Sequence, residues 1–183
     1  MPAGSVVMIS GPSGAGKSSV ARQLALSSPR ERTVHLHTDD FYGAIVKGFI
    51  EPFRPEANAQ NVVVVEAFTA CAKRFAQGGF EVVVDGVVGP WFLDRWQALA
   101  RDGFDVHYIV LRPDEPTTLA RATARTTAEA LTDPGAIRKI REGFANLGRF
   151  EAHVLDTTAL TLAATVVQVR SDVNARTRLL AEG

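Results

Sequence analysis

A glycine-rich stretch near the start of the chain has the residue types and the spacing needed to bind phosphate. Residues 11–18 read GPSGAGKS, in which two glycines enclose four residues and are followed by lysine and serine, the Walker A pattern. The stretch follows the apolar run VVMI at residues 6–9 and opens a helical pattern, the strand-loop-helix setting that this chemistry requires. The predicted nucleotide-binding residues are Gly11, Ser13, Gly14, Ala15, Gly16, Lys17, Ser18 and Ser19.

The pattern has a physical basis in how a backbone loop binds a triphosphate. Successive N–H groups must point inward, and glycines permit both the backbone angles and the close approach. The helix N-terminus that follows adds the positive end of its dipole. We expect Lys17 to reach the β- and γ-phosphates and Ser18 to bind Mg²⁺ through its hydroxyl. The alternative is a glycine-rich turn that caps a helix without binding a ligand.

An acidic residue follows a second apolar run. Asp85 ends the segment EVVVD at residues 81–85, and Gly86 comes next. An acid at the end of a buried strand is costly unless it is paired, so we predict that Asp85 binds Mg²⁺ through a water, as a Walker B aspartate does. Helix capping or a structural hydrogen bond is the alternative.

Apolar runs and helical patterns alternate along the whole chain. Five runs rich in Val and Ile predict buried parallel strands at residues 5–10, 33–37, 81–85, 105–111 and 153–155. Helical patterns cover residues 17–27, 56–77, 91–101, 116–125, 134–147 and 160–181. This alternation predicts an α/β fold in three layers, a parallel sheet with helices on both faces. We expect residues 1–183 to form a single domain.

The predicted strand ends mark the functional edge of the sheet. Ligands bind beyond the carboxyl ends of parallel strands. Four of the five predicted ends are followed by polar or glycine-rich sequence, at residues 11–18, 38–42, 85–90 and 156–158. Residues 43–55 contain two prolines, two glycines and several apolar residues, so they form either a loop that covers a substrate pocket or a packed connection.

Composition excludes several classes of partner. Twenty basic and twenty acidic side chains cancel, so the chain lacks the positive field that attracts nucleic acid. Cys71 is the one cysteine, so an internal disulfide is impossible and a reducing, cytoplasmic location is expected. The sequence contains no secretory signal pattern and no apolar run near the ~18 residues of a membrane span. It does not decide between a monomer and a homodimer.

Absent motifs and the order of elements together suggest a family. The chain has no Asn-Lys-x-Asp motif for guanine and no Leu-Ser-Gly-Gly-Gln signature, which argues against GTPases and transporter ATPases. Its small size, the early P-loop and the segment TDDFY at residues 38–42 resemble the P-loop small-molecule kinases. The layout is most similar to the chloramphenicol phosphotransferase-like proteins, and also resembles gluconate kinases and nucleoside kinases. The resemblance implies a five-stranded P-loop NTPase fold with strand order 2-3-1-4-5.

The same resemblance implies a catalytic base. In such kinases an aspartate just after the second strand lies near the acceptor hydroxyl, and Asp39 has the matching position, with Asp40 as its immediate rival. Chemistry also favours a carboxylate there, because the hydroxyl must lose its proton as the γ-phosphoryl group arrives. The alternative is that Thr38, Asp39 or Asp40 caps the following helix.

The residues that would bind the acceptor are harder to predict from the sequence. Residues 86–91 would line the acceptor pocket, with Trp91 either a wall of the pocket or a packing residue. Arg54, Gln60 and Asn61 would either hydrogen-bond the acceptor or face solvent. The four histidines, His35, His37, His107 and His153, are interpreted as structural, and His35 and His37 are expected on opposite faces of their strand.

Related kinases have arginines on a lid between the fourth and fifth helices, where guanidinium groups clamp phosphate. Arg125 matches that position, and the predicted lid at residues 126–133 holds no second arginine. The clamp is therefore incomplete unless Arg121, Arg138 or Arg141 contributes.

These residues predict transfer of the γ-phosphoryl group of ATP, with Mg²⁺, to a hydroxyl of a small-molecule acceptor. Lys17, Asp39 and Arg125 would act on the reacting groups. The alternatives are a nucleoside or nucleotide kinase, and a regulatory module that binds ATP without transferring phosphate.

Overall fold

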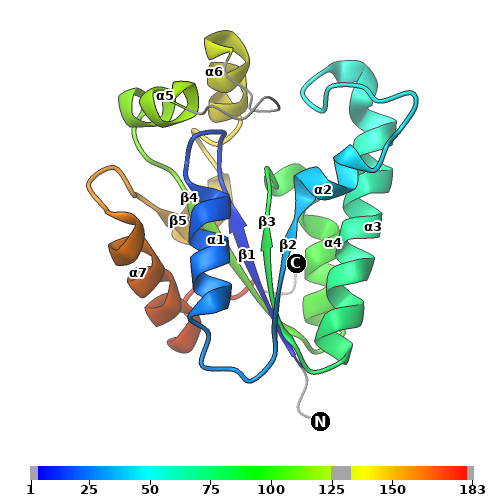
Figure 1. Cartoon of the computed structure of the whole chain (residues 1–183), viewed down its shortest axis with the longest axis vertical. Coiled ribbons are helices and arrows are strands. Elements are labelled where there is room, and N and C mark those ends of the chain that lie inside the picture. The colour runs from blue at the N-terminus through cyan, green and yellow to red at the C-terminus, as the bar shows by residue number, and fades with distance from the viewer. Residues whose placement is uncertain (1–3, 125–132, 181–183) are drawn as a thin grey trace.

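A computed structural model describes residues 4–124 and 133–180. At its centre lies a parallel sheet of five strands in the order β2-β3-β1-β4-β5 (Figure 1). The strands are β1 (Ser5–Ser10), β2 (Thr33–His37), β3 (Glu81–Asp85), β4 (Asp105–Leu111) and β5 (Val154–Leu155). The predicted fold class and strand order are therefore confirmed.

Seven α-helices in the described ranges connect these strands. They are α1 (Lys17–Leu26), α2 (Thr38–Gly43), α3 (Asn58–Gln77), α4 (Leu93–Arg101), α5 (Glu115–Thr123), α6 (Pro134–Glu142) and α7 (Leu162–Asn174). Helices α1 and α7 cover one face of the sheet, while α3 and α4 cover the other (Figure 1). Helices α2, α5 and α6 lie at the end of the sheet where the P-loop lies (Figure 1). None of the described helices is long and apolar enough to cross a membrane.

The two hydrophobic cores follow from the two-residue period of the strands. Along β1, Val6 and Met8 pack against the layer of α3 and α4, whereas Val7 and Ile9 pack against α1 and α7. All four side chains are 0% exposed. Because both faces are covered, the central strands are continuous apolar runs rather than alternating ones.

Several boundaries differ from the prediction, for local reasons. Pro55 and Pro90 begin short 3₁₀ turns, Pro55–Ala57 and Pro90–Phe92, ahead of α3 and α4. The segment after β2, which was not among the predicted helices, is the short helix α2. Helix α6 stops at Glu142 rather than residue 147, and the 3₁₀ turn Gly148–His153 leads into β5.

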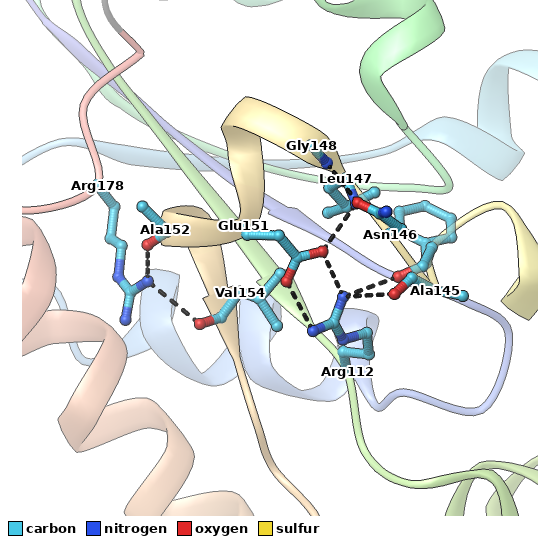
Figure 2. A network of polar contacts seen from close by, with 10 residues as sticks. Arg112, Ala145, Asn146, Leu147, Gly148, Glu151, Ala152, Val154 and Arg178 are labelled. Carbon is cyan, nitrogen blue, oxygen red and sulfur yellow. Dashed lines mark hydrogen bonds and ion pairs between the residues drawn. The ribbon is translucent and has the colours of Figure 1, made fainter.

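An arginine holds that last connection against the sheet (Figure 2). Arg112, directly after β4, pairs through two nitrogens with Glu151 at 2.9 and 2.8 Å. The same guanidinium donates to the carbonyl oxygens of Phe144 at 3.0 Å and Ala145 at 3.3 Å. Glu151 also accepts from the N–H of Leu147 at 2.7 Å. These bonds fix the turn from α6 to β5.

Candidate active site

The loop between β1 and α1 has the backbone geometry of a phosphate cradle. Gly11 and Gly14 have φ values of 137° and 87°, which side-chain-bearing residues rarely adopt. A Cβ at Gly11 would lie 2.2 Å from the carbonyl oxygen of Leu111, and one at Gly14 would lie 2.3 Å from that of Thr118. Glycine is therefore needed at both positions. The loop packs directly on β4 and α5.

Two side chains at the start of α1 are held by contacts with the loop and with β3. Lys17 is 7% exposed, and its Nζ lies 3.0 Å from the carbonyl oxygen of Pro12 in the same loop. Ser18 donates from its hydroxyl to the Oδ2 atom of Asp85 at 2.7 Å. Among the other predicted loop residues, Ser13 is buried and Ser19 is exposed on α1. The glycine loop and the end of β3 thus meet at one point.

Asp85 is completely buried, and two histidines of β2 bind it. His35 Nε2 lies 2.6 Å from Oδ1, and His37 Nδ1 lies 2.9 Å from Oδ2. The prediction that these histidines lie on opposite faces was wrong, because residues two apart on a strand share a face. Their interpretation as structural residues stays a prediction. The strand register also pairs His37 with Asp85. The site therefore includes two residues that sequence reasoning had set aside.

The donors around Asp85 stabilise its charged form. Burial alone would raise the pKa of Asp85, but the hydrogen bonds from His35 and His37, the charge of His37 and the Ser18 hydroxyl outweigh it and hold that pKa well below its usual range. Hydrogen bonds to Asp39 and then Asp85 raise the pKa of His37 to about 10, so the ring is positively charged at neutral pH. Asp85 thus remains an anion inside the protein.

Asp39 and Asp40 differ in what they contact. Asp39 Oδ2 lies 3.1 Å from His37 Nε2, although 79% of the Asp39 side chain is exposed. The hydrogen bond from His37, and further the charge of Lys17, lower the pKa of Asp39. Asp40 is exposed, and its carbonyl oxygen accepts from the N–H of Ala44. Of the two aspartates, Asp39 is the one linked to the cluster at Asp85.

Thr38 fixes the start of α2 against β3. Its hydroxyl donates to the main-chain carbonyl oxygen of Asp85 at 2.7 Å. A Cβ at Gly86 would lie 1.9 Å from that hydroxyl oxygen, so a side chain there would push α2 away. Thr38 therefore caps no helix end through its side chain but attaches α2 to the site.

The amides predicted as possible acceptor ligands are used within the protein instead. Gln60 receives the N–H of Ile50 at 2.9 Å and donates to the carbonyl oxygen of Ile50 at 2.7 Å. Asn61 donates to the carbonyl oxygen of Pro52 at 2.8 Å and accepts from Tyr42 at 3.0 Å. Both residues bind the loop of residues 43–55 to α3. Arg54 is exposed beside them, and no contact joins its side chain to Asp39 in the described chain.

Trp91 packs by one edge and is open on the rest of its surface. Its ring meets Phe144 at a centroid separation of 5.7 Å and lies against Gly89 and Gly143. The side chain is 52% exposed. Within the described residues no contact joins Trp91 to Asp39, so the role of Trp91 as a pocket wall stays a prediction.

The lid arginines are partly outside the described residues. Arg125 and residues 126–132 of the predicted lid lie outside the residues that the structure describes, so their predicted roles stay predictions. Arg121 donates to the carbonyl oxygen of Thr157 at 3.4 Å. Arg138 and Arg141 of α6 both pair with Glu115 of α5, at 3.3 and 3.7 Å.

An apolar groove of about 550 Å³ lies between α2 and α3. Phe41, Ile45 and Val63 are among the residues that line it. Phe41 turns toward α3, where its ring meets Phe68 edge-on at 5.0 Å, whereas Asp39 turns toward His37. The groove and the carboxylate cluster therefore lie on different faces of α2.

A family model described as AAA domain matches residues 6–147, which is most of the chain and includes the P-loop, α2 and β3. The chain belongs to the AAA domain family. No curated protein matches it at a significant level. The family match and the strand order agree with the predicted resemblance to P-loop proteins.

Solved structures with the same fold include a resistance protein and two kinases. The tunicamycin resistance protein of Deinococcus radiodurans is 18% identical, with a TM-score of 0.66 over 93% of this chain and 95% of that one. A gluconokinase from Sinorhizobium meliloti 1021 is 19% identical, with a TM-score of 0.67 over 95% and 93%. The Mycobacterium tuberculosis APS kinase, in complex with AMPPNP and APS, is 17% identical, with a TM-score of 0.66 over 95% and 98%.

Proposed function

We propose that this chain is an ATP-dependent phosphotransferase that moves the γ-phosphoryl group to a hydroxyl of a small molecule. The observation that supports it most is the 2.7 Å hydrogen bond between Ser18 and Asp85, which joins the phosphate loop to a buried carboxylate. Asp39 lies at the open end of the same cluster, within the influence of the charge of Lys17. The likeness of the fold to a gluconokinase and an APS kinase supports the same reaction class.

The donor set fits a magnesium ion held largely by groups that are not protein. Mg²⁺ is commonly bound through one or two protein oxygens, with phosphates and waters completing its shell. The Ser18 hydroxyl and the Asp85 carboxylate would supply those oxygens, Asp85 through a water. In the described part of the chain no group of three or more His, Cys, Asp or Glu side chains is arranged to hold a metal by itself. When bound, the ion would neutralise charge on the phosphate oxygens.

Each group of residues in the site would have a separate role in phosphoryl transfer. The loop N–H groups hold the triphosphate, and Lys17 balances negative charge on the phosphoryl group in transit. Asp39 orients the acceptor hydroxyl and accepts its proton. A bond forms between the acceptor oxygen and the γ-phosphorus, the bond from that phosphorus to the β-phosphate oxygen breaks, and ADP leaves. Arg125 would add positive charge from the lid.

Asp39 suits the role of base better than Asp40. Its carboxylate pairs with His37, which lowers its pKa and so keeps it ionised, and it is largely exposed to an incoming acceptor. A positioned base contributes about 10²- to 10⁴-fold to a rate. A base in this position needs no raised pKa, since the hydroxyl becomes acidic only as the phosphoryl group arrives.

The test is ADP formation, measured with Mg-ATP alone and with a panel of sugars, nucleosides and hydroxylated antibiotics. We expect one class to stimulate turnover, and Asp39→Ala to lower the stimulated rate about 10²- to 10⁴-fold, while Asp102→Ala, at an exposed aspartate paired with Lys73, retains it. Loss of stimulation in Asp40→Ala but not in Asp39→Ala would instead assign the base to Asp40. A nucleoside as the best acceptor would select the nucleoside kinase alternative.

Lys17→Ala separates a phosphotransferase from a module that only binds ATP. We expect turnover to fall about 100- to 1,000-fold, the usual effect of removing one preorganised group that stabilises transition-state charge. Lys73→Ala, on the surface of α3, is the matched control. Tight binding of ATP with no turnover under any acceptor would refute transfer, and intact turnover in Lys17→Ala would refute the assignment of the loop.

A further inference from the structure

His37 lies between the two carboxylates that the proposed reaction uses. Its Nδ1 atom is 2.9 Å from Oδ2 of Asp85, and its Nε2 atom is 3.1 Å from Oδ2 of Asp39. One ring therefore spans from the buried carboxylate beside the P-loop to the exposed carboxylate on α2. Both ring nitrogens face carboxylate oxygens.

The position of His37 in the fold makes this bridge rigid. His37 is the last residue of β2 and the residue just before α2, and the strand register sets it opposite Asp85. The side chain is 28% exposed. Among the ion pairs of the described residues, the one that includes the Asp39 carboxylate is with His37 Nε2, and 79% of the Asp39 side chain is exposed. The imidazole thus sets where that carboxylate points.

We propose that His37 is a positioning residue, which holds the acceptor-facing carboxylate of Asp39 at a fixed distance from Asp85 and the phosphate loop. This inference rests on the proposed function and names a residue for it that the P-loop pattern does not include. Alignment matters because a base must meet the acceptor hydroxyl along the line of transfer, and a displacement of about 1 Å can cost about 100-fold in rate.

His35 provides the internal comparison. It lies on the same face of β2 and contacts Asp85 at 2.6 Å through Nε2, but it has no contact with Asp39. A residue that only stabilises Asp85 should therefore behave like His35, whereas a residue that acts through Asp39 should behave differently. The two histidines separate support of the buried carboxylate from alignment of the base.

The first experiment uses amide side chains that replace one ring nitrogen each. The amide nitrogen of Asn overlays Nδ1, which faces Asp85, and that of Gln overlays Nε2, which faces Asp39. ADP formation is measured with Mg-ATP and the best acceptor of the panel, or with water as acceptor. We expect His37→Ala to lower kcat about 10- to 100-fold with little change in KM for ATP. His37→Gln should retain more turnover than His37→Asn, and His35→Ala should mainly raise the Mg²⁺ concentration needed.

A double-mutant cycle shows whether His37 acts through Asp39. In the Asp39→Ala background, adding His37→Ala should lower kcat no further than about twofold. Full additivity, or equal recovery by His37→Asn and His37→Gln, would overturn the proposal. Thermal unfolding of each variant shows whether a loss of turnover comes from misfolding. If His37→Ala is unstable, the test is the difference in turnover between His37→Asn and His37→Gln.

Nitrogen NMR of the His37 ring tests the bridge without catalysis. Asp39→Asn should move the ¹⁵N shift of Nε2 more than that of Nδ1, and Asp40→Asn should move neither. An Nε2 shift that ignores Asp39→Asn would overturn the proposal. A wild-type chain that forms no ADP would refute the proposed function, while the NMR comparison would still decide whether His37 joins the two carboxylates.

Discussion

Asp85 and Glu151 are both carboxylates held by several donors, yet their surroundings differ. Asp85 is fully buried and receives a serine hydroxyl and two imidazoles. Glu151 is 41% exposed, receives both arms of Arg112 and lies in the 3₁₀ turn Gly148–His153 ahead of β5 (Figure 2). Both networks lower the pKa of their carboxylate, so the electrostatic shift alone does not distinguish a site from a structural tie.

The difference is in where each network ends. The other bonds of Arg112 go to main-chain carbonyl oxygens, and the third bond of Glu151 comes from a main-chain N–H, so this network closes on the polypeptide itself. The network at Asp85 instead ends at the phosphate loop on one side and, through His37, at the exposed Asp39 on the other. A carboxylate cluster that reaches both a ligand loop and solvent is the one suited to chemistry.

The largest expected effect comes from breaking the Asp85 network. Asp85→Asn places an amide NH₂ among the donors that now surround a carboxylate. We expect ADP formation to fall at least about 100-fold. The free energy of unfolding should fall by about 3 kcal/mol, because buried charge-assisted hydrogen bonds are lost together. Turnover assays and urea unfolding of the same preparations measure both.

Asp172→Asn is the matched control. Asp172 is also buried, and it pairs with Arg178 at 3.0 Å and Gln168 at 2.9 Å, away from the P-loop. This variant should lose stability while turnover per folded molecule is retained. Equal losses of turnover in the two variants would mean that Asp85 contributes only to folding.

Breaking the Arg112 network should have an intermediate and purely structural effect. Arg112→Ala removes the bidentate pair and leaves the carbonyl oxygens of Phe144 and Ala145 without their donor. We expect the free energy of unfolding to fall by about 2 kcal/mol. Arg112→Lys should recover only part of it, since an ammonium lacks the planar fork. Hydrogen exchange should rise first in residues 143–155, and a large fall in turnover at full folding would contradict the comparison.

The fold was predictable from the sequence because its signals are local. Buried parallel strands are continuous apolar runs, and four of the five predicted ranges match the structure residue for residue. The fifth begins one residue later, at Val154. Strand order came from the resemblance to P-loop kinases. The helix ends were less predictable, since α6 and the 3₁₀ turn after it depend on the contacts of Arg112 and Glu151, which are distant in sequence.

Site residues that lie within one contiguous segment could be predicted from the sequence. Contacts between side chains of two different segments could not. The P-loop is contiguous, and Asp85 and Asp39 each follow a strand. His35 and His37 were missed, although their spacing on a strand predicts one shared face. Recognising their target required knowing that β2 pairs with β3 in the register that sets His37 opposite Asp85. The contacts of Gln60 and Asn61 could not be predicted, because they join α3 to main-chain groups of the preceding loop and to the Tyr42 hydroxyl, which a sequence does not mark.

The smallest and most specific effect concerns pH. The hydrogen bonds from Arg112 and from the N–H of Leu147 lower the pKa of Glu151 to about 2, from an ordinary value of 4.5. A folded-state pKa below the unfolded value means that the bonds stabilise the protein fully above about pH 4.5 and progressively less as the pH falls toward 2. Glu151→Gln removes this dependence, so wild type and variant should differ at neutral pH and converge in acid. Urea unfolding from pH 7 to pH 2.5 measures the gap, and 1 M NaCl should narrow it because the pair is partly exposed. If the difference in free energy of unfolding between wild type and Glu151→Gln stayed constant down to pH 2.5, Glu151 would stabilise the protein by packing rather than by its charge. Glu151 and Asp85 would then no longer be alike in their electrostatics.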